Sequence, residues 1–344
     1  MSNKVWLNEV SFMRPFLLLL LVSYHAFAPF CGSWSMPEGI HDFESYRWIA
    51  LFSRAFRLEA FVFISGYIFT FQLLTKDKFA SLSDLAIKKA KRLIIPCVVF
   101  GALYYILFND VSSLGSPIRI LTGIAHLWYL PCLFWLFIIH YVVIKRLKIK
   151  YLIGGGLIVV ALQSLSILPI PFQLNKVCYY YLFFYMGGLF YQKSEWIKQF
   201  TSVYKTIVIC SIFLALVYLC NVIIERNLIL TGGTQSMMMK LILIEINTYL
   251  KSGLAIVGIT AFYMIAVLYC RTHPISPLLL KIGTCGYGVY IFHQFILVYI
   301  YRLTSLPMML GTYWLPWFGF LVSVVGSLIL TILLRKTHIG KQYL

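Results

Sequence analysis

Long apolar runs follow one another along the chain, separated by short polar segments. A helix needs roughly 20 apolar residues to cross the hydrocarbon core of a bilayer, and ten runs approach that length. They lie approximately at residues 12–30, 48–74, 93–108, 123–144, 151–168, 177–192, 206–224, 243–269, 282–301 and 314–334. The second and eighth runs are long and the third and sixth are short, which predicts tilted or broken helices there. Runs without alternation also argue against a membrane β-barrel.

The composition excludes a water-soluble protein. Of the 344 residues, 61% are hydrophobic and only 12% are charged, and the mean hydropathy is +0.86. A soluble domain is about 45–50% apolar and about 25% charged, and a disordered chain has low hydrophobicity. We therefore expect an all-α, polytopic integral membrane protein with about ten transmembrane helices. A single transmembrane domain over residues 1–344, with no appended soluble domain, accounts for the whole pattern.

The charge predicts how the chain is oriented in the membrane. The net charge of +18 comes from 29 Lys and Arg residues against 11 Asp and Glu residues. In a soluble protein this excess would suggest nucleic-acid binding, whereas in a membrane protein cations collect in cytoplasmic loops. Placing the N-terminus in the cytoplasm puts most of these cations on the cytoplasmic side. We expect both termini in the cytoplasm, a location in the cell inner membrane, and no nucleic-acid partner.

Several kinds of site are not supported by the spacing of residues. The eight Cys residues are scattered without CxxC spacing, and the His residues lack zinc-site patterns such as HExxH. We therefore expect neither a metal site nor a disulfide framework. No glycine-rich phosphate loop and no GxGxxG motif appears, so a Rossmann or P-loop nucleotide fold is not predicted either.

Two polar residues in the first run share one face of the predicted helix. Arg14 and His25 are eleven residues apart, which is three helical turns and a rise of about 16 Å. A guanidinium near the cytoplasmic mouth suits phosphate groups, and a deep imidazole suits proton transfer. The alternative is that Arg14 extends to lipid headgroups and that His25 makes a hydrogen bond between helices.

Other ionisable groups at membrane depth form a short set of candidates, because such groups are costly in lipid. In the second run, Arg54 and Arg57 are i,i+3 neighbours that would share a helix face, and Glu59 would neutralise an Arg or orient His25. A purely structural ion pair is the alternative. Ser65, before a glycine, permits close helix approach or a kink.

Three further groups complete the candidates. The basic cluster that contains Lys88, Lys89 and Arg92 opens the third run, where it anchors the topology and could also bind a polyphosphate. His126 and Trp128 stand at the outer start of the fourth run, either as part of an aromatic belt or as a sugar platform. Tyr290 and His293 share a face in the ninth run.

Five motifs, taken together and in order, resemble the membrane acyltransferase family 3, the bacterial integral-membrane O-acyltransferases of surface glycans. They are the Arg14 to His25 spacing, the segment from Glu59 to Ser65-Gly66-Tyr67, the basic run from Lys88 to Pro96, His-Leu-Trp-Tyr-Leu at 126–130, and Tyr287, Tyr290 and His293. The resemblance covers nearly the whole chain. One departure is Gly286, where the family often has Ser, so a hydroxyl role at that position is not supported.

The resemblance implies transfer of an acyl group, most often acetyl, from cytoplasmic acyl-CoA to a hydroxyl of a sugar in a surface glycan or a lipid-linked glycan precursor. His25 would be the catalytic base, with Glu59 as a second catalytic candidate, and Arg14 would handle the donor. Lys89 and Arg92 would occupy the basic motif that assists donor binding, next to Lys88. Acyl-CoA would be the co-substrate, and no metal would be needed.

Two other classes of protein remain open. A transporter or flippase for a glycan or small anion would also have about ten helices and buried charges, but it often shows inverted repeats with interrupted helices, which the sequence lacks. An accessory membrane subunit would need no set of buried charges. The sequence specifies neither the acceptor nor the oligomeric state.

Overall fold

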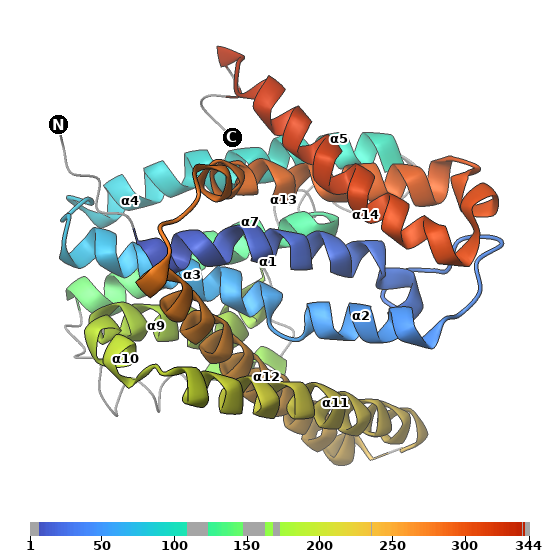
Figure 1. The fold of residues 1–344 in the computed structure, drawn as a ribbon, viewed down its shortest axis with the longest axis horizontal. Coiled ribbons are helices and arrows are strands. Elements are labelled where there is room, and N and C mark those ends of the chain that lie inside the picture. The colour runs from blue at the N-terminus through green and yellow to red at the C-terminus, as the bar shows by residue number, and fades with distance from the viewer. Residues whose placement is uncertain are drawn as a thin grey trace. The chain divides into compact units, whose positions relative to one another are not determined.

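The computed structural model describes residues 7–108, 123–146, 162–167, 173–234, 236–338 and 340, and every element assigned within them is helical (Figure 1). The first half contains α1 (Asn8–Ala26), η1 (Ala28–Cys31), α2 (Glu44–Arg54), α3 (Arg57–Leu74), α4 (Leu82–Lys89), η2 (Ala90–Ile94), α5 (Ile95–Phe108), η4 (Ala125–Trp128), α7 (Tyr129–Tyr141) and η5 (Val142–Arg146). The second half contains η6 (Leu165–Ile167), α9 (Leu174–Gln192), α10 (Ser194–Phe200), α11 (Val203–Gly233), α12 (Met237–Thr272), α13 (Pro277–Leu303) and α14 (Leu306–Leu334). The predicted fifth run, 151–168, lies largely outside the described residues.

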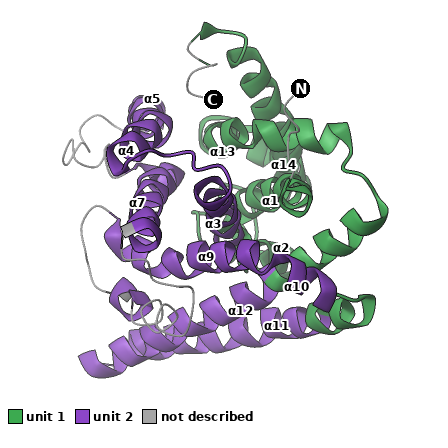
Figure 2. Cartoon of the chain, turned by 90° about the vertical axis from the view of Figure 1, so that its left-hand side faces the viewer, with its two compact units in different colours: residues 1–58, 201–210, 260–344 green, residues 59–200, 211–259 purple. Residues whose placement is uncertain are grey.

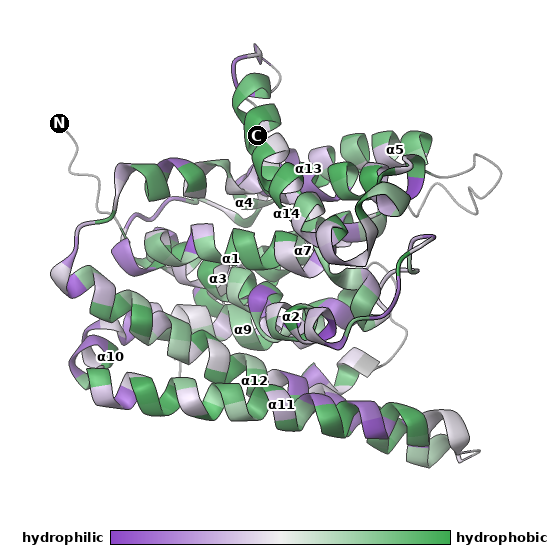
Figure 3. Ribbon diagram, turned by 45° about the vertical axis from the view of Figure 1, so that its right-hand side comes forward, coloured by the Kyte–Doolittle hydropathy of each residue, from purple (hydrophilic) through white to green (hydrophobic). Residues whose placement is uncertain are grey.

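Five helical stretches among the described residues are long and apolar enough to cross a membrane. They are Leu82–Phe108, Ala125–Lys145, Val203–Gly233, Met237–Thr272 and Leu306–Leu334. Figure 3 shows hydrophobic residues over much of α11 and α14. The described residues are thus all-helical and the protein crosses the membrane several times, while the count of ten spans and the cytoplasmic placement of both ends stay predictions.

The second predicted run is broken, as its length suggested. It forms α2 and α3, which are separated at residues 55–56. Arg54 is therefore the last residue of α2 and Arg57 the first of α3, so the expectation that they share one face of a continuous helix was wrong. The long eighth run behaves differently, because α12 continues over 36 residues. At 1.5 Å per residue it is about 54 Å long, well beyond a hydrocarbon core of about 30 Å.

The described chain divides into two compact units (Figure 2). Unit 1 comprises residues 1–58, 201–210 and 260–344, and unit 2 comprises residues 59–200 and 211–259. Unit 1 therefore contains α1, α2, α13 and α14, while unit 2 contains nearly all of α3 together with α4, α5, α7, α9 and α10. The division cuts through α11 and α12.

In unit 1, α1 runs parallel to α13. The paired positions advance together along both helices: a Cβ at Gly283 would lie 3.8 Å from the Arg14 Cβ, a Cβ at Gly286 would lie 3.1 Å from Leu18, and the His25 and His293 rings are 5.0 Å apart between centroids. Helix α14 returns antiparallel along α13, since Gly288 faces Thr331 and Gly319 faces Tyr301. Glycines at these positions let the backbones approach closely, as is usual for helix packing in membranes.

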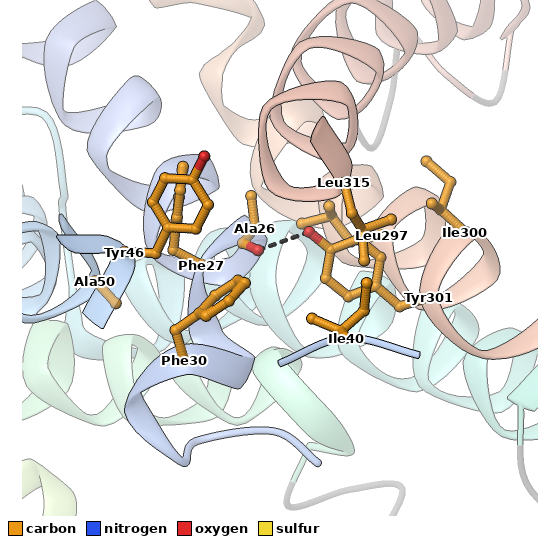
Figure 4. Close-up of a cluster of buried hydrophobic side chains, with 10 residues drawn as sticks. All are labelled: Ala26, Phe27, Phe30, Ile40, Tyr46, Ala50, Leu297, Ile300, Tyr301 and Leu315. Carbon is orange, nitrogen blue, oxygen red and sulfur yellow. Dashed lines mark hydrogen bonds between the residues drawn. The ribbon is translucent and has the colours of Figure 1, made fainter. Parts of the chain in front are cut away.

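A hydrophobic cluster at the end of α1 holds these helices together (Figure 4). It contains Ala26, Phe27, Phe30, Ile40, Tyr46, Ala50, Leu297, Ile300, Tyr301 and Leu315. Within it the Tyr301 hydroxyl donates a hydrogen bond of 2.6 Å to the carbonyl of Ala26, which is the last residue of α1. The cluster therefore fixes the end of α1 immediately after His25.

In unit 2, α3 crosses α9 at a contact that glycine makes possible. A Cβ added at Gly66 would lie 2.0 Å from the carbonyl oxygen of Phe184, and one added at Gly187 would lie 2.0 Å from the carbonyl oxygen of Phe63. Only residues without a Cβ allow the two backbones to come this close. Helix α7 joins them through the buried His140, whose Nε2 lies 3.2 Å from the Thr70 hydroxyl on α3.

Candidate active site

Arg14 and His25 lie on one helix, as their spacing predicts, and both face α13. The Arg14 side chain leaves α1 beside Gly283 and is half-buried. His25 is buried, and its ring lies 5.0 Å from the His293 ring on α13. Their separation of eleven positions corresponds to a rise of about 16 Å along α1. The guanidinium and the imidazole are therefore held at two levels along one helix pair.

Aromatic rings surround His25 within unit 1. The Trp34 ring centre lies 5.7 Å from that of His25, and Tyr290 contacts His293 at 6.3 Å between ring centres. Trp34 was missed by sequence reasoning because it stands in the polar segment after the first run, where nothing marks it as a neighbour of the helix. Buried aromatic surroundings lower the local dielectric and strengthen hydrogen bonds and charge interactions there.

Arg57 belongs to the same surroundings. It is buried, and its guanidinium carbon lies 3.7 Å above the centre of the Tyr24 ring, a cation–π contact next in sequence to His25. The Ser23 and Ser53 hydroxyls, 3.2 Å apart, join α1 to α2. Arg54, at the end of α2, is half-buried. The contact between Arg57 and Tyr24 joins the first residue of α3 to α1, and the sequence did not predict it.

In unit 2, Glu59 is buried near the start of α3. The Tyr179 hydroxyl on α9 donates a hydrogen bond of 3.1 Å to Glu59 Oε1. Tyr179 was not among the sequence candidates, although a run of three tyrosines at 179–181 is visible in the sixth apolar segment. The Ser65 hydroxyl donates to the carbonyl of Phe61 at 2.9 Å, so it is occupied within its own helix.

The basic cluster divides into two kinds of cation. Lys88 forms an ion pair of 2.8 Å with Asp84. The Lys89 ammonium lies against aromatic rings, 3.4 Å from the centre of Phe137 and within 6 Å of those of Phe69 and Phe79. Lys91 and Arg92 are exposed in the π-helical turn η2. Lys88 is exposed as well, so an anion can reach Lys88, Lys91 and Arg92 more directly than Lys89.

These contacts predict different effects for two substitutions in the cluster. We expect Lys89→Ala to lower the free energy of unfolding by about 1–2 kcal/mol, because the change removes both the cation–π contact and the packing of the lysine stem against the rings. Arg92→Ala, at an exposed position, should change stability by about 0.5 kcal/mol or less but should weaken acyl-CoA binding. Thermal unfolding and donor titration of both variants in detergent measure the two effects. Equal stability of both variants would contradict the role of the ring contacts.

His126 and Trp128 stand in a tight turn at the start of α7. Gly123 has a φ of +89°, and a Cβ there would come within 2.4 Å of the Trp128 backbone, so the turn requires glycine. His126 is buried. The Lys176 ammonium lies 3.7 Å from the centre of the Trp128 ring, so it covers one face of that indole. The Trp128 ring also lies 5.8 Å from that of Tyr180, so the sugar platform stays a prediction.

The sequence candidates fall into both units. Unit 1 holds Arg14, His25, Arg54, Arg57, Tyr290 and His293, and unit 2 holds Glu59, Ser65, Lys88, Lys89, Arg92, His126 and Trp128. In the structure the His25 ring contacts the His293 ring, and the Tyr290 ring also contacts His293. The expected action of Glu59 on His25 stays a prediction. Over the described residues, no group of three or more His, Cys, Asp or Glu side chains is placed to hold a metal ion.

Comparison with known proteins adds one finding. A family model described as an acyltransferase domain matches residues 7–336, which is nearly the whole chain and includes every candidate above. No curated protein and no solved structure matches the chain.

Proposed function

Because the chain belongs to acyltransferase family 3, a family of membrane acyltransferases, we propose that it moves an acyl group, with acetyl as the first candidate, from cytoplasmic acyl-CoA to a sugar hydroxyl. The acceptor would be a surface glycan or a lipid-linked glycan precursor at the inner membrane. The observation that supports this proposal is the pair of Arg14 and His25 on the α13-facing side of α1.

The donor would bind along α1. Its phosphates would contact Arg14, because a guanidinium offers forked donors to phosphate oxygens. The basic cluster of unit 2 is a separate candidate for donor binding. Lys88 and Arg92 are both exposed, although Lys88 also pairs with Asp84, whereas Lys89 lies against the phenylalanine rings. The pantetheine arm would then extend from Arg14 towards His25, over the rise of about 16 Å between them.

His25 would act as the general base. It would remove the proton from the acceptor hydroxyl as that oxygen attacks the thioester carbonyl, and a positioned base contributes about 10²–10⁴-fold. The tetrahedral intermediate would collapse with cleavage of the carbon–sulfur bond, and the imidazolium would return its proton to the CoA thiolate. Arg57, with Arg54 as the alternative, would stabilise the oxyanion. Attack by His25 itself, with an acyl-imidazole intermediate, is the covalent variant of this scheme.

Donor binding gives a direct test that needs no knowledge of the acceptor. We expect acetyl-CoA, at about 100 times its Kd, to stabilise the detergent-solubilised protein by about 2.7 kcal/mol in thermal unfolding. Acetylpantetheine, which keeps the thioester but lacks the nucleotide phosphates, should stabilise it less, and free sugars alone should not. In the Arg14→Ala variant, acetyl-CoA and acetylpantetheine should differ less in how much they stabilise the protein.

The second half of the test measures the reaction. Inner-membrane vesicles supplied with labelled acetyl-CoA should transfer the label to glycan material when the protein is present. Movement of a glycan or anion across the vesicle membrane without consumption of acetyl-CoA would favour a transporter instead. Absence of both donor stabilisation and label transfer would overturn the proposal.

A further inference from the structure

His293 is held rigidly within unit 1. Its side chain is completely buried, and its Nδ1 lies 2.9 Å from the carbonyl oxygen of Val289, one turn earlier on α13. The backbone carbonyl of His293 accepts a hydrogen bond of 2.7 Å from the Ser323 hydroxyl on α14. Both the ring and the backbone of this residue are therefore tied to neighbouring groups.

The contact with Val289 determines which ring nitrogen carries hydrogen. A carbonyl oxygen only accepts hydrogen bonds, so Nδ1 of His293 must be the donor. In a neutral imidazole with hydrogen on Nδ1, the other nitrogen, Nε2, is an acceptor. The backbone of α13 thus gives the His293 ring a defined donor side and a defined acceptor side.

The His293 ring, whose Nε2 is the acceptor, contacts the ring of His25. The two ring centres are 5.0 Å apart with 45° between the ring planes, a separation at which facing nitrogens can reach hydrogen-bond distance, ~2.7–3.2 Å, through a small rotation of the His25 ring. Catalytic hydrogen bonds are often long in a protein without substrate and shorten in the reacting complex. The parallel packing of α1 on α13 brings together these two imidazoles, which are 268 positions apart in the sequence.

We propose that His293 is a positioning residue for His25. Its Nε2 accepts a hydrogen bond from the N–H of His25, which leaves the other His25 nitrogen to receive the proton of the acceptor hydroxyl. The same contact stabilises the His25 imidazolium that forms during the reaction. This inference rests on the proposed function, because it assigns a partner to the base in that scheme.

Two substitutions separate positioning from simple packing. His293→Phe keeps a planar ring but removes both nitrogens, and it is expected to lower kcat about 10–100-fold while the KM for acetyl-CoA stays within about twofold. His293→Gln keeps a donor and an acceptor on one side chain, and it should restore kcat to within about fivefold of wild type.

A matched control is available in unit 2. His140 is also completely buried and contacts the Thr70 and Tyr181 hydroxyls. His140→Phe should therefore reduce thermal stability to a degree comparable with His293→Phe but leave kcat within about twofold of wild type. Wild-type kcat in His293→Phe, or the same loss of kcat in Phe and Gln variants, would overturn the proposal.

A spectroscopic measurement keeps the inference separate from the proposed function. The ¹⁵N shifts of the His25 ring in the full-length protein in nanodiscs report which nitrogen carries hydrogen, with no need for turnover. We expect them to change in His293→Phe and to stay close to wild type in His140→Phe. Unchanged shifts in His293→Phe would overturn the positioning role even if acyl transfer occurs. Failure of wild-type protein to transfer acyl groups would overturn the proposed function alone.

Discussion

Replacement of His25 by alanine is expected to lower acyl transfer about 10²–10⁴-fold, the contribution of a positioned general base. The buried His25 ring lies against His293 on α13. Because Arg14 lies about 16 Å away along α1, His25→Ala should retain the thermal stabilisation by acetyl-CoA. Label transfer to glycan measures the expected loss of acyl transfer. Thermal unfolding with and without acetyl-CoA, on the same preparation, measures the expected retention of donor binding.

Arg14→Ala should show the complementary behaviour. Loss of a guanidinium that binds phosphate removes ground-state affinity, so the KM for acetyl-CoA should rise and the stabilisation by acetyl-CoA should fall. His41→Ala serves as the control, since His41 is exposed in the loop before α2 and should leave both measurements unchanged. Full acyl transfer by either His25→Ala or Arg14→Ala in a well-folded preparation would remove that residue from the mechanism.

Replacement of Gly66 by alanine is expected to produce the largest loss of stability. The added Cβ would lie 2.0 Å from the carbonyl oxygen of Phe184, and because that atom belongs to backbone, no change of side-chain rotamer relieves the overlap. The crossing of α3 and α9 would have to open, with loss of contacts among the buried residues of unit 2. We expect a cost of about 3 kcal/mol or more, measured as a lower unfolding temperature and a smaller monodisperse fraction.

Two further variants make this test specific. Gly253→Ala is the same change within α12, where a Cβ would meet nothing within 4 Å, and it should stabilise the helix by about 0.5–1 kcal/mol. Gly187→Ala should be as harmful as Gly66→Ala, and the double variant should cost less than the sum of both, because the first substitution already separates the helices. Equal unfolding temperatures of Gly66→Ala and Gly253→Ala would refute the close crossing of α3 and α9.

Much of the architecture follows from the order of residues along the chain. The apolar runs predict an all-helical membrane protein, and five long apolar helices are found where the third, fourth, seventh, eighth and tenth runs lie. The shared face of Arg14 and His25 was also predictable, because helical geometry relates residues within one helix without reference to any other element.

Contacts between distant segments were not predictable in the same way. The phenylalanines around Lys89 come from positions 69, 79 and 137, and 17% of the chain is aromatic, so no local pattern marks these three. The break at residues 55–56 was expected only as one consequence of an overlong run. No Gly or Pro, the usual signals for the end of a helix, stands between residues 48 and 60 around this break.

The sequence by itself determined that this chain is helical, lies in a membrane, belongs to a family of acyltransferases and carries a guanidinium and an imidazole on one helix face. The helical membrane character and the shared helix face depend on hydrophobicity and on periodicity within single segments, whereas the family follows from a resemblance carried by five motifs along the chain. Only the tertiary structure decided that His25 contacts His293, that Arg57 covers Tyr24 and that glycines allow α3 to touch α9. These depend on which helix faces meet, and in a lipid-like environment small residues and hydrogen bonds decide that, because hydrophobicity favours no particular helix pairing.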